Sequence, residues 1–463
     1  MIENPIESFN QKIKKRRVAV IGIGVSNVPL IRFLAERGAK ITAHDRRTRG
    51  QLGSIYDELR GLGVEFVLGG SYLDEIRGDA EMIFKTPGVR FDEPAIAEAV
   101  AGGAVLSSEM ELFFELCPAP IIGVTGSDGK TTTTSLIYDM LKRAGYKCYL
   151  GGNIGSPLIY DVESIKPDDK VVVELSSFQL HTMKKSPHIA VVTNVTPNHL
   201  DWHKDYDEYI EAKKAIFANQ SEGGRAVFNY DNDITRSLCA EARCGVYFSR
   251  QNKLTDGYCI NDGYIVQFKN GKEVRRILDT RDIYIPGVHN IENYMAAIAA
   301  TEGLVSDEII RETAKGFVGV PHRIEFVREL GGVKFYNDSI ASSPARTTAG
   351  LNSFEQKVVL IAGGYDKKIP FDDFGAVVCS RVKKLVLCGF TADKIEAAVK
   401  AAPNFDGSLE IYKLDDFREA VTKAKDIAEP GDVVILSPAC ASFDKFKNFE
   451  ERGNMFKQIV KEF

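Results

Sequence analysis

Short apolar runs and stretches with helical spacing alternate along most of this chain. The runs are rich in Val and Ile and contain few polar residues, which is typical of strands buried on both faces of a parallel sheet. They cover residues 17–24, 40–45, 120–122, 170–174, 189–194, 356–364, 384–389 and 432–437. Apolar residues return at helical spacing in 28–37, 133–141, 206–217, 393–400 and 415–427. The pattern predicts an α/β fold in which helices flank mainly parallel sheets.

Two features subdivide this pattern. Residues 245–281 alternate more strongly between apolar and polar positions and contain the turn sequences Asn261-Asp-Gly and Asn270-Gly, so we expect small antiparallel hairpins there. At three places along the chain, a predicted strand is followed by a glycine-rich turn and a helix. We therefore expect three domains, which cover residues 1–108, 109–319 and 320–463.

The composition excludes several classes of protein. With 463 residues the chain is long enough for about three domains of ~150 residues each. The net charge of −5 disfavours a nucleic acid or an acidic membrane surface as partner. No apolar stretch approaches the roughly 18 residues of a membrane span, the N-terminus lacks the core of a signal peptide, and the eight cysteines form no C-x-x-C pair. We expect a cytoplasmic monomer with reduced thiols and no membrane insertion.

The segment 123–132, Gly-Val-Thr-Gly-Ser-Asp-Gly-Lys-Thr-Thr, carries the most specific chemical signal. It lies between an apolar run and a helix, where backbone N–H groups and a helix N-terminus commonly hold phosphate. Lys130 would reach the terminal phosphates of ATP, and the Thr131 hydroxyl would bind Mg²⁺. The longer form of this motif has glycine where Val124 stands, and the alternative interpretation is a glycine-rich turn with an incidental lysine. We predict that ATP contacts Gly126, Ser127, Asp128, Gly129, Lys130, Thr131 and Thr132.

A weaker glycine signal follows the first apolar run. The spacing Gly22-x-Gly24-x-x-Asn27 resembles a dinucleotide-binding turn, and Asp45 ends the next run 21 positions after Gly24. Asn27 replaces the third glycine of that pattern, which hinders close contact between helix and strand. We favour a uridine diphosphate group over NAD at this turn, and the alternative is a βαβ unit that binds nothing. On this pattern the first and third domains are Rossmann-like and the central one is a phosphate-loop (P-loop) domain.

Two strand ends carry candidate metal ligands. Glu174 ends the run 170–174, and a carboxylate at the tip of a parallel strand beside a phosphate loop can hold Mg²⁺ directly. Its alternative role is a hydrogen bond to a helix N-terminus. His199 and His203 stand four residues apart, but no third ligand follows at a convincing spacing, so we reject zinc. His199 could bind a second Mg²⁺ or a transferring phosphate, whereas His203 better fits a core or capping histidine.

Seven segments of the chain resemble the Mur ligase family, ATP-dependent ligases that build the peptide stem of bacterial peptidoglycan. They occur in family order over essentially the whole chain, at 125–131, 174–180, 199–203, 287–293, 321–325, 337–339 and 437–453. The segments 175–180 and 437–446 are similar to those of the members that add D-glutamate, and the D-N-P-R motif of the diaminopimelate-adding members does not occur. The resemblance implies that the substrates are ATP, UDP-N-acetylmuramoyl-L-alanine (UDP-MurNAc-L-Ala) and D-glutamate.

The resemblance also implies residue roles. It makes Lys130, Glu174, His199, Lys213 and Arg323 the catalytic set. It implies two Mg²⁺ ions bound by Thr131, Glu174, His199 and Lys213, with Lys213 carbamylated so that a cation becomes an oxygen ligand. By composition alone, Lys213 and Lys214 would instead form a solvated pair.

The resemblance also assigns residues to the substrates. It adds Asn293, His322, Arg323 and Asp338 to the ATP site. It implies that Gly24, Val25, Ser26, Asp45, Thr86, Pro87 and Gly88 hold the UDP group, that Asn153 and Ser176 contact the same substrate, and that Lys367, Ser442 and Phe449 bind D-glutamate.

One segment departs from the family pattern. After Asn337-Asp-Ser339, related enzymes commonly have K-A-T-N, whereas this chain has Ile340-Ala-Ser-Ser343. The change removes a charged contact, and Arg346 is a candidate replacement.

Rival functions explain less of the sequence. A folate-adding ligase needs no UDP-holding first domain, an NAD-dependent oxidoreductase leaves the segment 123–132 and Glu174 unexplained, and a nucleotide switch needs no C-terminal substrate domain.

Overall fold

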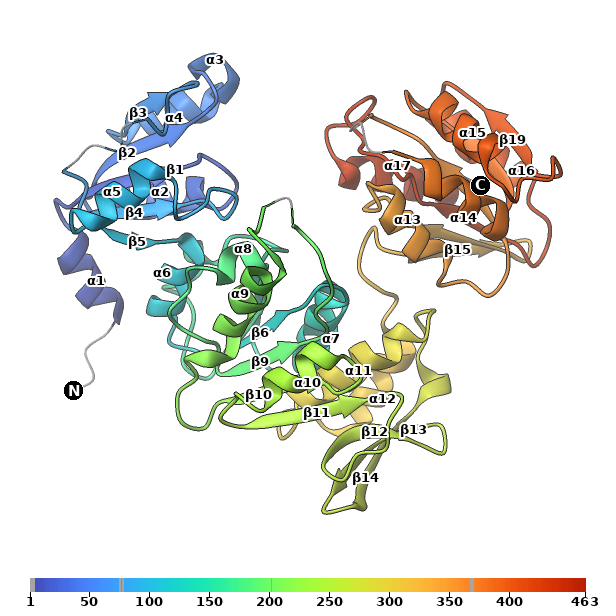
Figure 1. Ribbon diagram of the computed structural model, residues 1–463, viewed down its shortest axis with the longest axis horizontal. Helices are drawn as coiled ribbons and strands as arrows, with labels where there is room; N and C mark the ends of the chain where they lie inside the picture. The colour runs from blue at the N-terminus through green and yellow to red at the C-terminus, as the bar shows by residue number, and fades with distance from the viewer. Residues whose placement is uncertain (1–4, 75, 77–78, 201, 367–369) are drawn as a thin grey trace. The chain divides into compact units, whose positions relative to one another are not determined.

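The computed structural model describes residues 5–74, 76, 79–200, 202–366 and 370–463 (Figure 1). The chain divides into two compact units. The first consists of Met1–Asp282 with Ile291–Ala314, and the second of Ile283–Asn290 with Lys315–Phe463. In the described part of the chain, no helix is both long and apolar enough to cross a membrane.

The first sheet of the first unit is parallel and has the strand order β3-β2-β1-β4-β5. Its strands are β1 (Arg17–Ile21), β2 (Lys40–Asp45), β3 (Glu65–Leu68), β4 (Met82–Lys85) and β5 (Val105–Ser107), and its helices are α1 (Pro5–Ile13), α2 (Asn27–Glu36), α3 (Arg49–Leu52), α4 (Ser54–Gly61) and α5 (Pro94–Ala101). Successive residues of β1 face opposite sides: Val20 joins the core that contains α2, whereas Ile21 packs with Ile96 of α5. Helices therefore cover both faces. The strand order reverses between β1 and β4, where such sheets open a crevice at the carboxyl ends of their strands.

The second sheet of this unit has nine strands, in the order β14-β13-β12-β11-β10-β9-β6-β8-β7. The strands are β6 (Ile121–Thr125), β7 (Cys148–Gly152), β8 (Lys170–Glu174), β9 (Ile189–Val192), β10 (Arg225–Asn229), β11 (Gly245–Ser249), β12 (Gly257–Asn261), β13 (Tyr264–Lys269) and β14 (Lys272–Asp279). The accompanying helices are α6 (Glu109–Leu116), α7 (Lys130–Arg143), α8 (Ser177–Leu180), α9 (Tyr206–Ala218), α10 (Asp233–Cys239), α11 (His289–Ala300) and α12 (Asp307–Gly316), with 3₁₀ turns at Leu158–Tyr160 and Thr280–Asp282.

The antiparallel hairpins expected in this sheet are confirmed for β12, β13 and β14. Their turns contain Gly263 and Gly271, both at positive φ, as the turn sequences predict. The expectation is wrong for β11, the first strand of the same stretch, because β11 pairs in parallel with both β10 and β12. Helix α10 connects β10 to β11, and such a crossover brings the chain back in the parallel direction.

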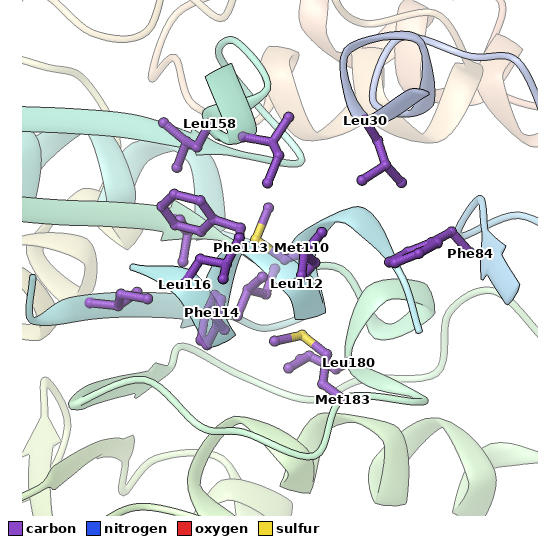
Figure 2. Close-up of a cluster of buried hydrophobic side chains, with 14 of the residues drawn as sticks. Leu30, Phe84, Met110, Leu112, Phe113, Phe114, Leu116, Leu158, Leu180 and Met183 are labelled. Atoms are coloured by element: carbon purple, nitrogen blue, oxygen red, sulfur yellow. The ribbon is translucent and has the colours of Figure 1, made fainter. Parts of the chain in front are cut away.

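One hydrophobic core joins the first and second sheets. Helix α6 contributes Met110, Leu112 and Phe113 to a buried cluster that also contains Leu30 of α2 and Leu180 of α8 (Figure 2). Burying one side chain of this kind stabilises the fold by about 1.5–3 kcal/mol, so the cluster holds the two sheets together. Residues on both sides of position 108 thus share one core. The domain boundaries at 108 and 319 stay predictions.

The second unit contains a sheet in the order β15-β16-β20-β17-β18-β19, in which β15 pairs antiparallel with β16 and the other pairs are parallel. Its elements are β15 (Glu325–Leu330), β16 (Val333–Asn337), α13 (Pro344–Leu351), β17 (Val358–Ala362), α14 (Asp372–Arg381), β18 (Val382–Leu387), α15 (Ala392–Ala401), β19 (Glu410–Lys413), α16 (Phe417–Asp426), β20 (Val433–Leu436) and α17 (Phe449–Glu462). One buried cluster includes residues of α13, α14 and α15, and a second includes residues of α16 and α17. The predicted α/β fold, with three mainly parallel sheets flanked by helices, is confirmed.

Candidate active site

The phosphate-loop segment connects β6 to α7. Gly126 and Gly129 have φ angles of 151° and 77°, which residues with side chains rarely adopt. A Cβ on Gly126 would lie 1.9 Å from Thr193 Oγ1, and a Cβ on Gly129 would lie 2.4 Å from Asn293 Oδ1. Asn293 Oδ1 also accepts a hydrogen bond from Thr133 Oγ1 across 3.2 Å, so α11 is held against this loop. The loop backbone approaches its neighbours so closely that only glycine fits at these two positions.

Lys130, the first residue of α7, folds over its own loop. Its Nζ atom donates to the carbonyl oxygens of Gly126 and Ser127, both across 2.9 Å. Ser127 is held in turn by Tyr209, whose hydroxyl oxygen lies 2.8 Å from Ser127 Oγ, and by Asn194, whose carbonyl accepts from Ser127 N across 2.9 Å. An ammonium group is thus fixed against the loop that the sequence assigns to phosphate, and Thr131 follows it in the first turn of α7.

Lys213 lies on the buried face of α9 and is 1% exposed. Its Nζ atom donates to the carbonyl oxygen of Gly126 across 2.9 Å. Burial lowers the pKa of Lys213 well below its ordinary value, and the charge of Lys130 lowers it further. The adjacent Lys214 instead pairs with Glu211 across 2.8 Å. The interpretation of both lysines as a solvated pair is therefore wrong for Lys213, because the helix turns that side chain inward.

Glu174 ends β8 and is 1% exposed. Its Oε1 accepts from Asn153 Nδ2 across 2.8 Å, whereas its Oε2 is buried with no hydrogen-bond partner among the described residues. The helix-capping role considered for this acid falls to Ser176, whose Oγ accepts from Gln179 N across 3.3 Å at the start of α8. The charge of Glu174 acts on Lys213 and raises its pKa, against the larger effect of burial. A buried carboxylate oxygen without a donor suits a cation.

His199 lies on the loop after β9 in a left-handed conformation, with a φ angle of 55°. Its exposed ring contacts Phe178 of α8, and the two ring centroids lie 4.9 Å apart. Helix α8 begins directly after β8, so this contact joins His199 to the strand end that carries Glu174. The candidate metal ligands from β8 and from the loop after β9 therefore lie at the carboxyl edge of the same sheet.

His203 belongs to a different group. Its Nδ1 lies 3.4 Å from Glu208 Oε2, and His181 Nε2 lies 3.5 Å from Glu208 Oε1, a spacing that could hold a metal ion. Both oxygens of Glu208 already accept from Arg90, however, across 2.9 and 3.1 Å. A metal ion would meet the charge of that guanidinium group. His203 is buried, and its Nε2 lies 2.9 Å from Ser177 Oγ, which fits the interpretation of this residue as a core histidine.

Arg90 ties the loop after β4 to the second sheet. Besides Glu208 of α9, it donates to the carbonyl oxygen of Trp202 across 2.8 Å. In the opposite direction, the Trp202 indole Nε1 donates to the Gly88 carbonyl across 3.0 Å. Hydrogen bonds from Arg90 lower the pKa of Glu208 to about 2. The segment that the resemblance assigns to UDP is thus joined to the motif 199–203, and no pattern in the sequence singled out Arg90 or Glu208.

The first glycine turn lies at the point where the strand order reverses. Asn27 is buried, and its Nδ2 donates to Ile21 O across 3.0 Å and to Gly22 O across 2.8 Å. A Cβ on Gly22 would lie 2.8 Å from Thr86 Cγ2, so Thr86, the first residue of the segment 86–88, packs directly against the turn. The Asn27 side chain therefore closes the turn in place of a third glycine and leaves its tip exposed at Val25.

Asp45 ends β2 beside this turn, and its carboxylate is already engaged. It accepts from Ile23 N across 2.7 Å and from the Arg47 guanidinium across 2.8 and 2.9 Å. Burial raises the pKa of Asp45, but the hydrogen bonds from Arg47 and Ile23 outweigh burial and bring the pKa down to about 2. A group that binds Asp45 at this turn would therefore also meet the Arg47 guanidinium. The sequence did not single out Arg47, because an arginine two residues after an acid at a strand end is a common pattern.

The second unit gathers several predicted residues around the end of β16. Asp338 is 3% exposed, and its Oδ2 accepts from Ser437 Oγ across 2.6 Å. Burial raises the pKa of Asp338 to about 7, while the charges of Arg323 and Arg346 act in the opposite direction. Arg346, the candidate replacement for the missing family lysine, therefore acts on this carboxylate from the first turn of α13.

The residues assigned to D-glutamate lie partly in this region. Phe449 begins α17, and its ring packs edge-on against His322 with centroids 5.9 Å apart. Ser442 is 2% exposed on the loop after β20. Lys367 lies outside the described residues.

Arg452 of α17 is a structural residue of this region that the sequence did not reveal. It is 3% exposed and donates to the backbone carbonyl oxygens of Ser339, Cys440 and Ala441 across 2.9–3.1 Å. Burial lowers its pKa to about 10. Because these carbonyls belong to the loops after β16 and β20, Arg452 holds together the two loops that carry Asp338 and Ser442.

Comparison with known protein families places this arrangement in one class. Residues 16–107 match the Mur ligase MurD-like, N-terminal domain, residues 124–301 match the Mur ligase middle domain, and residues 322–440 match the Mur ligase, glutamate ligase domain. The chain belongs to the Mur ligase family.

Relatives of this chain share one name. A protein of Acetivibrio thermocellus is 56% identical over 459 residues, which is 98% of each chain. A protein of Ruminiclostridium cellulolyticum is 52% identical over 463 residues, which is 99% of each chain. Both relatives are named UDP-N-acetylmuramoylalanine--D-glutamate ligase.

Solved structures agree with the fold. The UDP-N-acetylmuramate-alanine ligase MurC of Thermotoga maritima is 19% identical, with a TM-score of 0.59 over 96% of this chain and 99% of that chain. The MurF ligase of Thermotoga maritima in complex with ADP is 18% identical, with a TM-score of 0.54 over 98% of this chain and 97% of that chain. At these identities the likeness shows the shared architecture.

Proposed function

We propose that this protein is an ATP-dependent ligase that joins D-glutamate to UDP-MurNAc-L-Ala in the synthesis of peptidoglycan precursors. The observation that carries the proposal is its 56% identity, over 98% of both chains, to a protein named UDP-N-acetylmuramoylalanine--D-glutamate ligase. The phosphate loop, the buried Lys213 and the unpartnered oxygen of Glu174 supply groups that such a reaction needs.

The reaction proceeds through two bond exchanges. The L-alanine carboxylate of UDP-MurNAc-L-Ala attacks the γ-phosphorus of ATP, so that a C–O–P linkage forms and ADP leaves. The neutral amine of D-glutamate then attacks the carbonyl carbon of this acyl phosphate, and the tetrahedral intermediate collapses to the amide. The C–O bond to phosphate breaks, inorganic phosphate leaves with its electron pair, and the amine releases one proton.

The protein contributes mainly position and charge. Lys130 neutralises phosphate oxygens of ATP from the phosphate loop, and Arg323 does so from the C-terminal domain. We also assign to ATP the residues Asn293, His322 and Asp338, as well as Gly126, Ser127, Asp128, Gly129, Thr131 and Thr132. Positioned charges of this kind are effective because they need no reorganisation when the phosphoryl group moves.

Two Mg²⁺ ions belong to this proposal, with Thr131, Glu174, His199 and Lys213 as their ligands. Mg²⁺ prefers oxygen, and the buried Oε2 of Glu174 has no other partner among the described residues. When bound, the ions would draw charge from the phosphate oxygens. Lys213 fits as a carbamate, because burial lowers its pKa, and an amine that loses its proton more easily adds CO₂, with loss of one proton, more readily.

The remaining predicted residues divide between the two other substrates. Gly24, Val25, Ser26, Asp45, Thr86, Pro87 and Gly88 hold the UDP group, Asn153 and Ser176 contact the same substrate, and Lys367, Ser442 and Phe449 bind D-glutamate. For these sites we keep the domains predicted from the sequence, 1–108, 109–319 and 320–463. We place the enzyme in the cytoplasm, because ATP and soluble precursors are its substrates, and we propose that it is a monomer.

Release of ADP tests the proposed function. Purified protein with ATP, Mg²⁺ and UDP-MurNAc-L-Ala should release ADP rapidly on addition of D-glutamate, and omission of any substrate should stop it. L-Glutamate, L-lysine, L-alanine and diaminopimelate serve as matched alternatives in the same assay. Faster turnover with any of these than with D-glutamate would overturn the assignment.

A further inference from the structure

His322 is held by its own backbone and by one edge of its ring. It has a φ angle of 64°, and its backbone N donates to Glu325 Oε2 across 2.8 Å. Its ring Nδ1 lies 3.0 Å from Asn337 Nδ2. No hydrogen bond of the described residues ends on its Nε2. A Cβ on Gly453 would lie 2.1 Å from Nδ1, so α17 also closes on this edge of the ring.

The amide of Asn337 has one orientation that satisfies its surroundings. Its Oδ1 accepts from Ser339 N across 3.2 Å, and its Nδ2 donates to Glu325 Oε2 across 2.9 Å. A flipped amide would set its oxygen against the carboxylate oxygen and its NH₂ group against a backbone N–H. Both contacts would be repulsive, because neither pair contains both a donor and an acceptor. Glu325 is itself fixed by Lys457, whose Nζ lies 3.0 Å from Oε1.

This orientation decides which ring nitrogen of His322 carries the proton. An amide nitrogen donates but does not accept. His322 Nδ1, at 3.0 Å, lies closer to Asn337 Nδ2 than the Gly453 carbonyl oxygen does at 3.5 Å, so Nδ1 accepts the second N–H of Asn337. An Nδ1–H group would face an N–H at 3.0 Å, which is a buried clash of two donors. Burial also lowers the pKa of His322, and the charge of Lys457 adds to this, which favours the neutral ring.

We infer that Asn337 holds His322 as the neutral tautomer protonated on Nε2, so that the ring presents one fixed donor to the nucleotide. Asn337 is then a positioning residue, and Glu325 fixes Asn337. The role toward the nucleotide rests on the proposed function, whereas the tautomer does not. The partner group on the nucleotide must be an acceptor, such as a phosphate oxygen, because Nε2–H can only donate.

The tautomer can be read directly by NMR. The full chain is labelled with ¹⁵N-histidine, and long-range ¹H–¹⁵N correlations are recorded without nucleotide at pH 7. The chain has seven histidines, and the His322→Gln variant identifies the His322 signals. We expect the pattern of a neutral ring with its proton on Nε2. A proton on Nδ1, or a doubly protonated ring, would overturn the inference.

Two substitutions test whether Asn337 is the cause. In Asn337→Asp a carboxylate oxygen faces Nδ1 and accepts a hydrogen bond from it, so the proton of the neutral ring should move from Nε2 to Nδ1. In Asn337→Ser, which adds no charge, the two neutral tautomers should mix. If Asn337→Asp does not fold, Asn337→Ser decides the question, and an unchanged tautomer in the variant measured would overturn the inference.

Kinetics then connect the tautomer to the reaction. Asn337→Asp should lower kcat/KM for ATP by roughly 10- to 100-fold and change the KM for D-glutamate much less, because a hydrogen bond to a charged group is lost. The control is Asn404→Asp, which adds the same charge at an exposed asparagine of the same unit that bonds Ala376 O and Ser380 Oγ. Failure of the proposed function would appear as absent ADP release in the unmodified protein, with the NMR result unaffected.

Discussion

Lys130 and Lys213 donate hydrogen bonds to the same acceptor, the carbonyl oxygen of Gly126, each across 2.9 Å. Two ammonium groups on one carbonyl repel each other strongly away from water, because the effective dielectric constant there is low. The more deeply buried of the two, Lys213, is the one that loses charge most easily. The structure therefore places an amine with a lowered pKa against the loop that the sequence assigns to phosphate.

Carbamylation of Lys213 is the first prediction. Protein equilibrated with ¹³C-bicarbonate should show one carbamate signal in ¹³C NMR at neutral pH, because burial lowers the pKa of Lys213 and so makes its amine easier to deprotonate. Lys213→Ala should lose the signal, and activity should fall close to background. Lys214→Ala should keep both the signal and the activity, since Lys214 pairs with Glu211 and Glu241 at the surface. A signal that persists in Lys213→Ala would assign the carbamate to another amine.

Metal dependence of nucleotide binding is the second prediction. ADP should bind more tightly with Mg²⁺ than with a chelator, and Glu174→Gln should remove most of that difference. A loss of roughly 10- to 100-fold is expected, in line with the loss of an oxygen that helps hold a metal. Calorimetric titration with and without Mg²⁺ measures the effect, and Glu222→Gln, an exposed acid of the same unit, is the control. If Mg²⁺ raised the affinity of Glu174→Gln for ADP as much as that of the unmodified protein, Glu174 would not be a ligand of the metal.

The bond from Arg90 to Glu208 gives the third prediction. Arg90→Met should lower the free energy of unfolding at pH 7 by about 2–4 kcal/mol, because it leaves the mostly buried Glu208 carboxylate without its cation. Urea unfolding, followed by the fluorescence of the single tryptophan, measures this free energy. That tryptophan is Trp202, whose carbonyl oxygen accepts a hydrogen bond from Arg90, so the signal comes from a residue in contact with Arg90. Arg49→Met is the control: Arg49 and Asp57 form an exposed pair 3.4 Å apart, so its loss should stay within about 0.5 kcal/mol.

The same pair makes stability depend on pH in a defined direction. The pKa of Glu208 is lowered from 4.5 to about 2 in the folded protein, so the unfolded chain binds the proton more tightly. This contribution is present above pH 4.5 and is lost as the pH falls toward 2. The stability difference between the unmodified protein and Arg90→Met should therefore shrink on acidification from pH 7 to pH 3. A difference that stays constant or grows would contradict the assigned role of Arg90.

Gly453 gives the fourth prediction. Exchange of glycine for alanine within a helix ordinarily stabilises a protein by about 0.5–1 kcal/mol. Gly453→Ala should instead destabilise it by about 1–3 kcal/mol, because the new Cβ would lie 2.1 Å from His322 Nδ1. Gly61→Ala in α4, where a Cβ meets no atom within 4 Å, should be neutral or stabilising. Denaturant unfolding of both variants at pH 7 compares them, and a stabilised Gly453→Ala would disprove the close contact.

Much of the fold followed from local pattern. The apolar runs became β1, β2, β6, β8, β9, β17, β18 and β20, and the glycine-containing turn sequences became the hairpins of β12 to β14. The direction of β11 did not follow, because alternation of polar and apolar residues indicates a half-buried strand without telling which neighbour it pairs with. Pairing direction depends on the path of α10, which the strand sequence does not contain.

The candidate site, like the fold, was predicted from the sequence only in part. The sequence by itself predicted a glycine-rich turn between a strand and a helix at 123–132, since Gly126, Gly129 and the start of α7 lie within one turn of each other. The neighbours that leave room only for glycine there, Thr193 and Asn293, came from the tertiary structure. Only the tertiary structure separated Lys213 from Lys214, brought Arg90 to Glu208 from 118 positions away, and set the Asn337 amide against His322. Charge state, tautomer and metal-binding capacity are properties of a side chain's surroundings. Those surroundings come from packing between distant segments, which no local pattern records.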